Sequence, residues 1–393
     1  MEYEIYGLRE NPFPKGGAIL KPDSKDPREN GSIFSVQARS KEIKEFEEKF
    51  VGTKTSFDDR IRCGFIWAEG DRTTGRGMGK TALSIYMKHK INDEHRYGKN
   101  YFDGAHKFFC SYIPFEVQLK SKIAFFYRAA FISFIKEGLF SHIAQCVSKD
   151  NLIKAGVDED FADAVANNNM KNYLESLSRY KIGEMSTAWD QRFLVKLPDL
   201  FLNQTTICLI AAGFKGGILL IDDIENLTDK STRSEIENFI KDFGIAFFRA
   251  GNEVSNNNFY TTILTTHEQS ARKISEAWTV AGLSTSFPLV SRGQVSLLTR
   301  KPDVEHCRDM VVQYLKRYRI HSFTPSTEFY PFKEDAIDTV IQECNYHPRR
   351  FLSLFNRILV EALSKDVKEI TSEFVKIVPE VEEDEESTGI EDI

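Results

Sequence analysis

The alternation of apolar and polar positions along the chain predicts strands followed by helices. Residues 65–68 (FIWA) form a short apolar run, which is typical of a buried strand. A polar, glycine-rich stretch follows, and residues 80–87 then space their apolar positions as an amphipathic helix does. Further apolar runs at residues 107–113 and 218–221 predict two more strands, and the β-branched stretch at residues 259–266 predicts another. Strands that alternate with helices favour an α/β fold with a parallel sheet.

The other apolar positions of the chain predict helices. Residues 118–147 read as one long helix with a phenylalanine-rich stripe, which we interpret as core packing. Residues 148–205 are polar and helical in pattern and give no strand signal. From about residue 300 onward the pattern is helical, and residues 345–352 start a helix with proline in its first turn. Residues 370–375 predict the cap and start of a final helix.

The stretch between the first strand and its helix has the composition of a phosphate-binding P-loop. Its glycines allow the backbone to approach phosphate oxygens closely. Lys80 is expected to reach the β- and γ-phosphates of ATP, and Thr81 to ligate Mg²⁺. The match to G-x-x-x-x-G-K-[ST] is incomplete, because Thr74 replaces the first glycine. The predicted nucleotide-binding residues of this stretch are Gly75, Gly77, Met78, Gly79, Lys80, Thr81 and Ala82.

The third predicted strand ends in acidic residues. In α/β sheets the carboxyl ends of parallel strands face the ligand site, so Asp222 is expected to hold Mg²⁺ through its water shell. The next position of such a Walker B strand normally carries a glutamate that orients the attacking water. Asp223 stands there and is one methylene shorter, and Glu225 follows it. Either Asp223 acts through a displaced water, or Glu225 takes the role, or hydrolysis is slow.

The order of these motifs resembles that of a known family. An Asn11-Pro12-Phe13 segment, a helix led by Arg39, the P-loop and the acidic strand follow one another as in AAA+ ATPases. The chain resembles the replication-initiator (origin-recognition) type and the ExeA and TniB transposition-helper type, over most of residues 1–378. The resemblance implies an AAA+ P-loop NTPase with ATP and Mg²⁺ as ligands. It also implies that the helix after Arg39 packs near the adenine.

The resemblance implies roles for three more residues. Thr266, beside Thr265, matches the polar sensor of the γ-phosphate, and an ordinary threonine at a strand end is the alternative. Arg292 matches the arginine finger that reaches the γ-phosphate of a neighbouring subunit, and an exposed loop charge is the alternative. Arg349 matches the arginine of the AAA+ lid that touches the nucleotide, with Arg350 in reserve.

Together these patterns predict four parts. Residues 1–50 are an N-terminal extended segment and helix, and residues 51–299 are the nucleotide-binding core. Residues 300–378 form a helical lid, and residues 379–393 are an acidic disordered tail. Because a plain AAA+ core passes from its second to its third strand much sooner, residues 148–205 are predicted to be a helical insertion.

Charge and composition limit the remaining possibilities. The formal net charge is −6, but the tail carries eight carboxylates and no Lys or Arg, so the rest of the chain sums to +2. Such a body neither requires nor excludes nucleic acid. The six cysteines form no C-x-x-C pair, the N-terminus does not resemble a signal peptide, and no apolar run is long enough to cross a bilayer. We therefore expect a cytoplasmic protein without a membrane partner.

The predicted function is that of an ATPase that acts as a nucleotide-dependent assembly switch, as a homo-oligomer and with duplex DNA as its first candidate target. A signalling or defence-type switch is the first alternative, with a protein partner bound through the helical insertion or the acidic tail. The second alternative is an ATP-dependent scaffold with weak hydrolysis, which the incomplete P-loop and Asp223 suggest.

Overall fold

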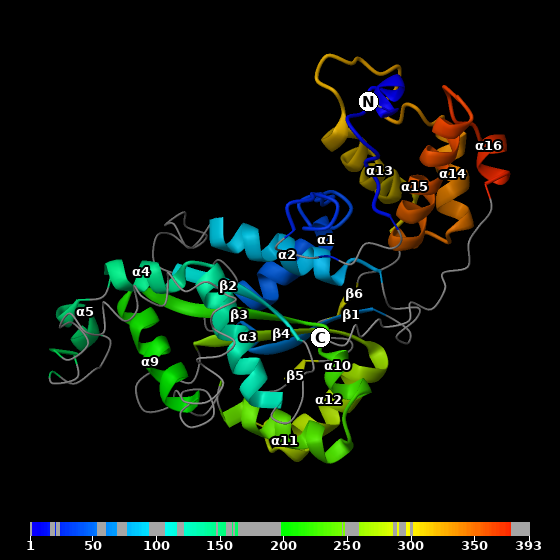
Figure 1. Cartoon of the computed structure of the whole chain (residues 1–393). Helices are drawn as coiled ribbons and strands as arrows, with labels where there is room; N and C mark the ends of the chain where they lie inside the picture. The colour runs from blue at the N-terminus through cyan, green and yellow to red at the C-terminus, as the bar shows by residue number, and fades with distance from the viewer. Residues whose placement is uncertain are drawn as a thin grey trace, which may run out of the picture. The chain divides into compact units, whose positions relative to one another are not determined.

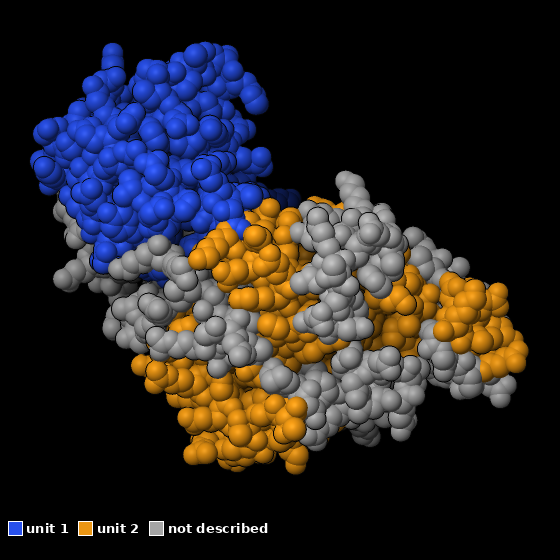
Figure 2. Space-filling view, turned by 180° about the vertical axis from the view of Figure 1, so that it is seen from behind, with its two compact units in different colours: residues 1–40, 77–82, 300–393 blue, residues 41–76, 83–299 orange. Residues whose placement is uncertain are grey.

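The protein is described from a computed structural model. The described residues are 2–15, 20, 24–52, 60–68, 77–93, 107–115, 122–146, 148–154, 159, 162–163, 198–245, 247, 259–285, 289–290, 296–298 and 302–378. The chain divides into two compact units (Figure 2): unit 1 comprises residues 1–40, 77–82 and 300–393, and unit 2 comprises residues 41–76 and 83–299. The N-terminal segment therefore belongs to the same unit as the C-terminal helices.

Unit 2 is built on a parallel sheet (Figure 1). The described strands are β1 (Cys63–Ala68), β2 (Lys107–Pro114), β3 (Phe214–Asp222), β4 (Tyr260–His267), β5 (Leu289–Val290) and β6 (Ser296–Leu298). Their order is β2-β3-β4-β1-β5, β6 also pairs with β1, and every pairing is parallel. β4 thus lies between β1 and β3. The predicted α/β fold with a parallel sheet is confirmed at this level.

The helices that lie wholly or mainly in unit 2 precede or connect these strands. They are α1 (Ser40–Phe46), η2 (Glu47–Val51), α2 (Lys80–Ile91), α3 (Lys122–Lys136), α4 (Leu139–Cys146), α5 (Lys149–Lys154), α9 (Pro198–Ala211), α10 (Glu225–Asp229), α11 (Arg233–Gly244) and α12 (Glu268–Val280). The prediction of one helix over residues 118–147 is wrong. The chain turns at Gly138, where φ is 64°, and this conformation ends α3 before α4 begins.

The long strands are buried on both faces. Every residue of β1 and of β4 is buried. Alternate residues such as Phe65 and Leu219 belong to a large hydrophobic cluster with α3, α11 and α12, and their neighbours Ile66 and Leu220, on the opposite face, are equally buried. Figure 1 shows α2 on one side of the sheet and α11 and α12 on the other. Strands covered on both faces are continuous apolar runs in the sequence, which is why the runs predicted them.

The region predicted to be an insertion, residues 148–205, is described in part. α5 and the first half of α9 fall within it, and both are helical. α5 packs against α9, which in turn packs against β3. Leu152 and Ala162 belong to the large hydrophobic cluster of unit 2. The described portion of this region is therefore part of the core of unit 2, and residues 164–197 lie outside the described residues.

Unit 1 is helical. Its helices are η1 (Glu2–Tyr6), α13 (Val304–Tyr318), α14 (Glu334–Glu343), α15 (Pro348–Ser364) and α16 (Ser372–Lys376). α13 and α14 bury apolar residues in one hydrophobic cluster with α15. The predicted first-turn proline of α15 is Pro348, and Thr371 accepts a hydrogen bond as the cap of α16. Both helix starts predicted from the sequence are confirmed.

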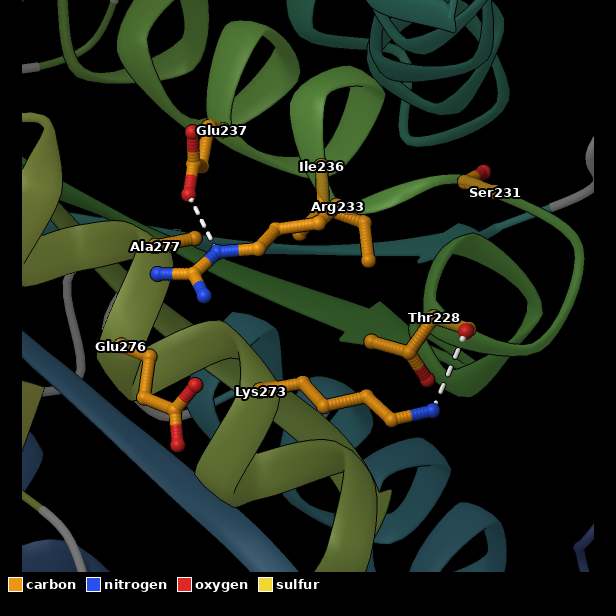
Figure 3. Close-up of a pocket in the computed structure, with 8 residues that line it drawn as sticks. All are labelled: Thr228, Ser231, Arg233, Ile236, Glu237, Lys273, Glu276 and Ala277. Carbon is orange, nitrogen blue, oxygen red and sulfur yellow. Dashed lines mark hydrogen bonds and ion pairs between the residues drawn. The ribbon is translucent and has the colours of Figure 1, made fainter.

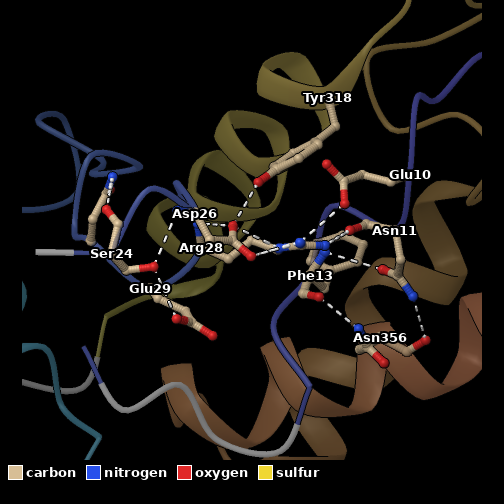
Figure 4. Close-up of polar contacts among 10 residues, drawn as sticks. Glu10, Asn11, Phe13, Ser24, Asp26, Arg28, Glu29, Tyr318 and Asn356 are labelled. Atoms are coloured by element: carbon tan, nitrogen blue, oxygen red, sulfur yellow. Dashed lines mark hydrogen bonds and ion pairs between the residues drawn. The ribbon is translucent and has the colours of Figure 1, made fainter. Parts of the chain in front are cut away.

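The N-terminal segment is anchored inside unit 1 by a closed set of hydrogen bonds (Figure 4). The Asn11 side-chain amide donates to the Asn356 carbonyl oxygen at 3.0 Å, and the Asn356 amide donates to the Phe13 carbonyl oxygen at 2.6 Å. The Phe13 N–H donates to Asn11 Oδ1 at 3.1 Å. The buried Phe13 ring lies 5.2 Å from the Phe355 ring, so the Asn-Pro-Phe segment is part of the core of unit 1.

The cysteines whose side chains the structure describes are buried and form no disulfide with one another: Cys63, Cys110, Cys208, Cys307 and Cys344. Burial raises the pKa of the Cys63 thiol to about 12, so this thiol stays protonated at neutral pH and is a poor nucleophile. Within the described residues, no helix combines the length and apolar character needed to span a bilayer.

Candidate functional site

Most of the described residues predicted to be functional fall in or beside two polar clusters. The β3 carboxylate cluster, in unit 2, consists of Asp222, Tyr112 and Thr265. The second cluster, which we call the P-loop turn after the role predicted for it, consists of residues 77–82 of unit 1.

The β3 carboxylate cluster surrounds one buried acid. Asp222 is the last residue of β3, and its side chain is 1% exposed. The Tyr112 hydroxyl, from β2, donates to Asp222 Oδ2 at 2.5 Å. The Thr265 hydroxyl, from β4, donates to Asp222 Oδ1 in a short hydrogen bond. The two strands that flank β3 therefore each supply one hydroxyl to one oxygen of the carboxylate.

These two hydroxyl groups satisfy part of the hydrogen-bonding capacity of the buried carboxylate. A hydrogen bond to a charged group stabilises a fold by about 1.5–3 kcal/mol. Burial first, and then the charge of Asp222, raises the pKa of Tyr112 far above its ordinary value, so Tyr112 remains a neutral donor. A carboxylate has about four lone-pair sites, of which two hydroxyls occupy two. The hydrogen bonds described for Asp222 therefore occupy only part of its accepting capacity.

The two candidates for the catalytic carboxylate have different surroundings. The Asp223 side chain is exposed, and its backbone adopts a left-handed φ of 57°. Its N–H donates to Thr265 Oγ1 at 3.1 Å, which ties it to the β3 carboxylate cluster. Glu225 is the first residue of α10 and is 3% exposed. A left-handed non-glycine residue costs roughly 1–2 kcal/mol, and such strain concentrates at functional sites.

Thr265, rather than Thr266, contacts the acid of β3. Successive side chains of a strand point to opposite faces of the sheet. Thr266 pairs with Trp67 of β1, which faces the large hydrophobic cluster, and the Thr266 hydroxyl donates to the His267 carbonyl oxygen at 3.3 Å. Thr265 faces the other way, toward Asp222.

The end of β4 is connected to α10 through polar contacts. His267 is buried, and its ring caps α12 by accepting a hydrogen bond from the Ser270 N–H at 3.4 Å. The Ser270 hydroxyl lies 2.6 Å from the Thr228 hydroxyl, on α10. These contacts hold α10, the helix that begins with Glu225, against the carboxyl end of β4.

The P-loop turn has the backbone conformation that its glycines permit. Gly77 and Gly79 have φ values of 75° and 89°, which residues with a side chain rarely adopt. α2 begins at Lys80, as predicted, so the P-loop turn includes the first backbone N–H groups of this helix. The Lys80 side chain is 8% exposed, and Thr81 and Ala82 are half-buried in the first turn of α2.

A buried arginine fixes the backbone of the P-loop turn. Arg39 is 3% exposed, and its Nη2 donates to the Met78 carbonyl oxygen at 2.8 Å. A Cβ atom at Gly79 would lie 3.3 Å from the same Nη2. Arg39 thus packs on the turn itself, and its positive charge directs a backbone carbonyl toward it.

The first turn of α15 packs against the P-loop turn. A Cβ atom at Gly77 would lie 2.5 Å from Cβ of Arg349 and 2.7 Å from Cε1 of His347, so only glycine fits there. The predicted lid residue Arg349 is half-buried, and Arg350 is exposed. The structure thus brings together Gly77 and Arg349, two residues that were predicted separately.

Two predicted residues, Gly75 and Arg292, lie outside the described residues. A comparison with models of known protein families finds no match, and a search of curated proteins finds no significantly similar sequence.

Tyr112, Thr265 and the contact of Arg39 with the P-loop turn were not predicted from the sequence. Tyr112 lies in an apolar run and reads as a core residue, and Thr265 is one of four threonines in its strand. The strand register could have selected Thr265, because only every second residue of β4 shares the face of Asp222. That register is not visible in the sequence.

A separate pocket of about 280 Å³ lies between α10, α11 and α12 (Figure 3). Its two cations are engaged: Arg233 pairs with Glu237 at 2.8 Å, and Lys273 Nζ donates to the Thr228 carbonyl oxygen at 3.4 Å. None of the predicted site residues lines it. The lining residues are Thr228, Ser231, Arg233, Ile236, Glu237, Lys273, Glu276 and Ala277.

Proposed function

We propose that this protein is an ATPase of the AAA+ class that binds ATP with Mg²⁺. The observation that carries the proposal is the order of strands in the sheet. β1, which leads to the P-loop, and β3, which ends in Asp222, lie on either side of β4. The connections that leave β1 and β4 run in opposite directions along the sheet, toward β2 and β5. Parallel sheets bind ligands at the carboxyl ends of strands at such a reversal.

The residues at hand fit a magnesium nucleotide. Lys80 and the N-terminal N–H groups of α2 would bind the phosphates, and Thr81 and Asp222 would hold the metal. Mg²⁺ would neutralise charge on the β- and γ-phosphate oxygens. The described residues contain no group of three His, Cys, Asp or Glu side chains arranged to hold a metal ion. Mg²⁺ suits such a protein, because it takes most of its ligands from water and phosphate.

We assign the catalytic carboxylate to Asp223, with Glu225 as the alternative. The Asp223 side chain is exposed and its backbone strained, whereas Glu225 is buried at the start of α10. A group that orients water must reach solvent when substrate enters, which favours Asp223. Asp223→Asn is expected to lower kcat by about 100-fold with little change in the affinity for ATP, and Glu225→Gln to lower it by less than about tenfold.

The proposed biological role is nucleotide-dependent assembly on duplex DNA. The support for this role is the resemblance to initiators and transposition helpers. Arg349 would contact nucleotide within the subunit, and Arg292 would act on the nucleotide of a neighbouring subunit. Assembly would then complete the catalytic site, because a charge supplied in trans is present only in the oligomer.

ATP turnover as a function of protein concentration, with and without duplex DNA at low salt, tests this function. A rate per subunit that rises with concentration and rises again with DNA is expected. A rate that rises with concentration but ignores DNA would favour the protein-partner switch. Tight ATP binding without turnover at any concentration would favour the scaffold, and absence of ATP binding would reject the ATPase.

A further inference from the structure

Unit 1 carries a groove that shares no residue with the P-loop turn, Arg39 or Arg349. This groove has a volume of about 950 Å³. The groove is formed by residues 9–10, by residues within 27–34, and by the C-terminal part of α13 with the segment that follows it. The groove is defined by Arg9, Glu10, Pro27, Ser32, Ile33, Phe34, Gln313, Lys316, Arg317, Tyr318, Arg319, Ile320, His321 and Phe323.

The groove is positively charged. Four of its lining residues are Lys or Arg, and Glu10 is the single lining carboxylate. Glu10 is itself paired with Arg28 at 3.0 Å (Figure 4). Lys316 lies 3.7 Å from Glu328, but both side chains are more than half exposed, so this pair is weak. The lining cations are therefore in clear excess.

Backbone carbonyls rather than carboxylates hold two of the arginines in place. Arg9 donates to the Arg317 carbonyl oxygen at 2.6 Å. Arg319 donates to the carbonyl oxygens of Tyr6 at 3.0 Å and Tyr330 at 2.7 Å. The ion pairs among the described residues include neither of them, nor Arg317. A carbonyl fixes a guanidinium without cancelling its charge, and a guanidinium has five N–H donors, so donors remain for an anion.

Local helix chemistry accounts for part of this charge. Lys316 and Arg317 occupy the last turn of α13, where the helix dipole favours cations, and Arg9 satisfies one of the terminal carbonyls. It does not account for the aromatic rings in the same groove. Phe34 and Phe323 are partly exposed, and the Arg319 guanidinium lies 5.9 Å from the Phe323 ring centroid.

We propose that this groove binds the sugar-phosphate backbone of a nucleic-acid strand. The cations would contact phosphates, and Phe34 and Phe323 would pack against bases or sugars. A basic groove with interleaved aromatic rings is the combination that single-stranded nucleic acids require, and its basic part also serves duplex phosphates. The inference rests on the proposed function, for which it identifies the nucleic-acid surface.

The test uses the full chain with the double substitution Lys316→Ala and Arg317→Ala. The matched control is Lys230→Ala with Lys241→Ala, two exposed lysines of unit 2. Fluorescence anisotropy with a labelled duplex and a labelled single strand is recorded across a salt series. The groove variant is expected to bind at least about tenfold more weakly at low salt. Its slope of log K against log salt should fall by about 1.8 for duplex or about 1.4 for single strand, and the control should match the wild type.

The probes separate single-stranded from duplex binding. Phe34→Ala with Phe323→Ala should weaken single-strand binding about tenfold and leave the salt slope unchanged, because base stacking is not ionic. A weakening confined to the single strand would assign the aromatic rings to bases. Equal weakening on duplex would assign them to the backbone, and both results support the groove.

Three results would overturn the inference. They are a groove variant whose salt slope equals that of the control, wild-type protein that binds neither oligonucleotide at low salt, and binding of a polyglutamate peptide in place of the oligonucleotides. The affinity for ATP with Mg²⁺ is measured on the same proteins. If ATP does not bind but the groove dependence holds, the proposed ATPase fails while the groove stands. If ATP binds but the groove variant matches the control, the proposed ATPase stands and the groove is rejected.

Discussion

In the β3 carboxylate cluster a buried negative charge is held by neutral hydroxyl groups, whereas in the P-loop turn a neutral carbonyl is held by a buried positive charge. In the first cluster, the hydroxyl groups of Tyr112 and Thr265 are neutral donors to the Asp222 carboxylate. Arg39 binds the Met78 carbonyl, so the second cluster turns a backbone oxygen toward a guanidinium and begins a helix at Lys80. Each of the two clusters is therefore built from residues of its own unit.

Gly77→Ala is expected to have the largest effect, because the P-loop turn depends on its backbone. The new Cβ would overlap Arg349 at 2.5 Å, and φ would be strained at 75°. We expect a loss of about 3 kcal/mol in the free energy of unfolding, as the sum of strain and overpacking. Gly213→Ala is the matched control, since Gly213 has φ 90° but nothing within 4 Å of the added Cβ. It should cost only about 1 kcal/mol in urea unfolding. Equal losses would show that no close approach exists at Gly77.

Tyr112→Phe tests how the carboxylate is held. The substitution removes one hydrogen bond to Asp222 and leaves the ring in place. We expect a loss of about 1.5 kcal/mol at pH 7 by urea unfolding. Tyr346→Phe is the control, because Tyr346 is half-buried and its hydroxyl has no described hydrogen bond, and it should stay within about 0.5 kcal/mol of the wild type. An unchanged free energy of unfolding in Tyr112→Phe would mean that Thr265 alone holds the acid.

Arg39→Met tests whether the P-loop turn serves the binding of ATP rather than the chemical step. It keeps most of the buried volume and removes the donor to Met78. The affinity for ATP with Mg²⁺ should fall about tenfold, seen as a higher KM, while kcat changes by less than about twofold. The control Arg272→Met, at an exposed position of α12, should leave KM unchanged. A fall in kcat with constant KM would assign Arg39 to the chemical step instead of to the turn.

The pH dependence of stability gives the smallest effect. The pKa of Tyr112 is raised in the folded protein from its ordinary value of 10.0, so its contribution is complete below pH 10 and is lost as pH rises above it. Each pH unit above 10 should cost the wild type about 1.4 kcal/mol relative to Tyr112→Phe. The two proteins should therefore become equally stable near about pH 11. A difference that is constant between pH 7 and pH 11 would contradict the raised pKa.

The sheet could be predicted from the sequence because burial on both faces leaves a continuous apolar run. β3 is such a run, and the acidic residues that end it predict that Asp222 and Asp223 lie at the carboxyl edge of the sheet. The start of α2 at Lys80 and the first-turn Pro348 of α15 were equally local features. Signals of this kind need only neighbouring residues.

Two contacts of unit 1 could not be predicted, because each joins distant residues through a backbone carbonyl, a group that every residue has. Arg39 binds a backbone carbonyl 39 positions away, and Asn356 binds the Phe13 carbonyl across 343 positions. A carbonyl oxygen carries no sequence signature. The break between α3 and α4 was missed for the opposite reason, since the apolar stripe continues through Gly138.

The most direct test of the central claim is the binding of ATP to the full chain in the presence of Mg²⁺, measured by isothermal titration calorimetry on wild type, Lys80→Ala and Lys44→Ala. Lys80 begins α2 in the P-loop turn, whereas Lys44 is an exposed lysine of α1. The account predicts binding by wild type and Lys44→Ala, and at least about 100-fold weaker binding by Lys80→Ala, because a phosphate would lose its charge partner. Full affinity in Lys80→Ala, or no binding by the wild type, would contradict it.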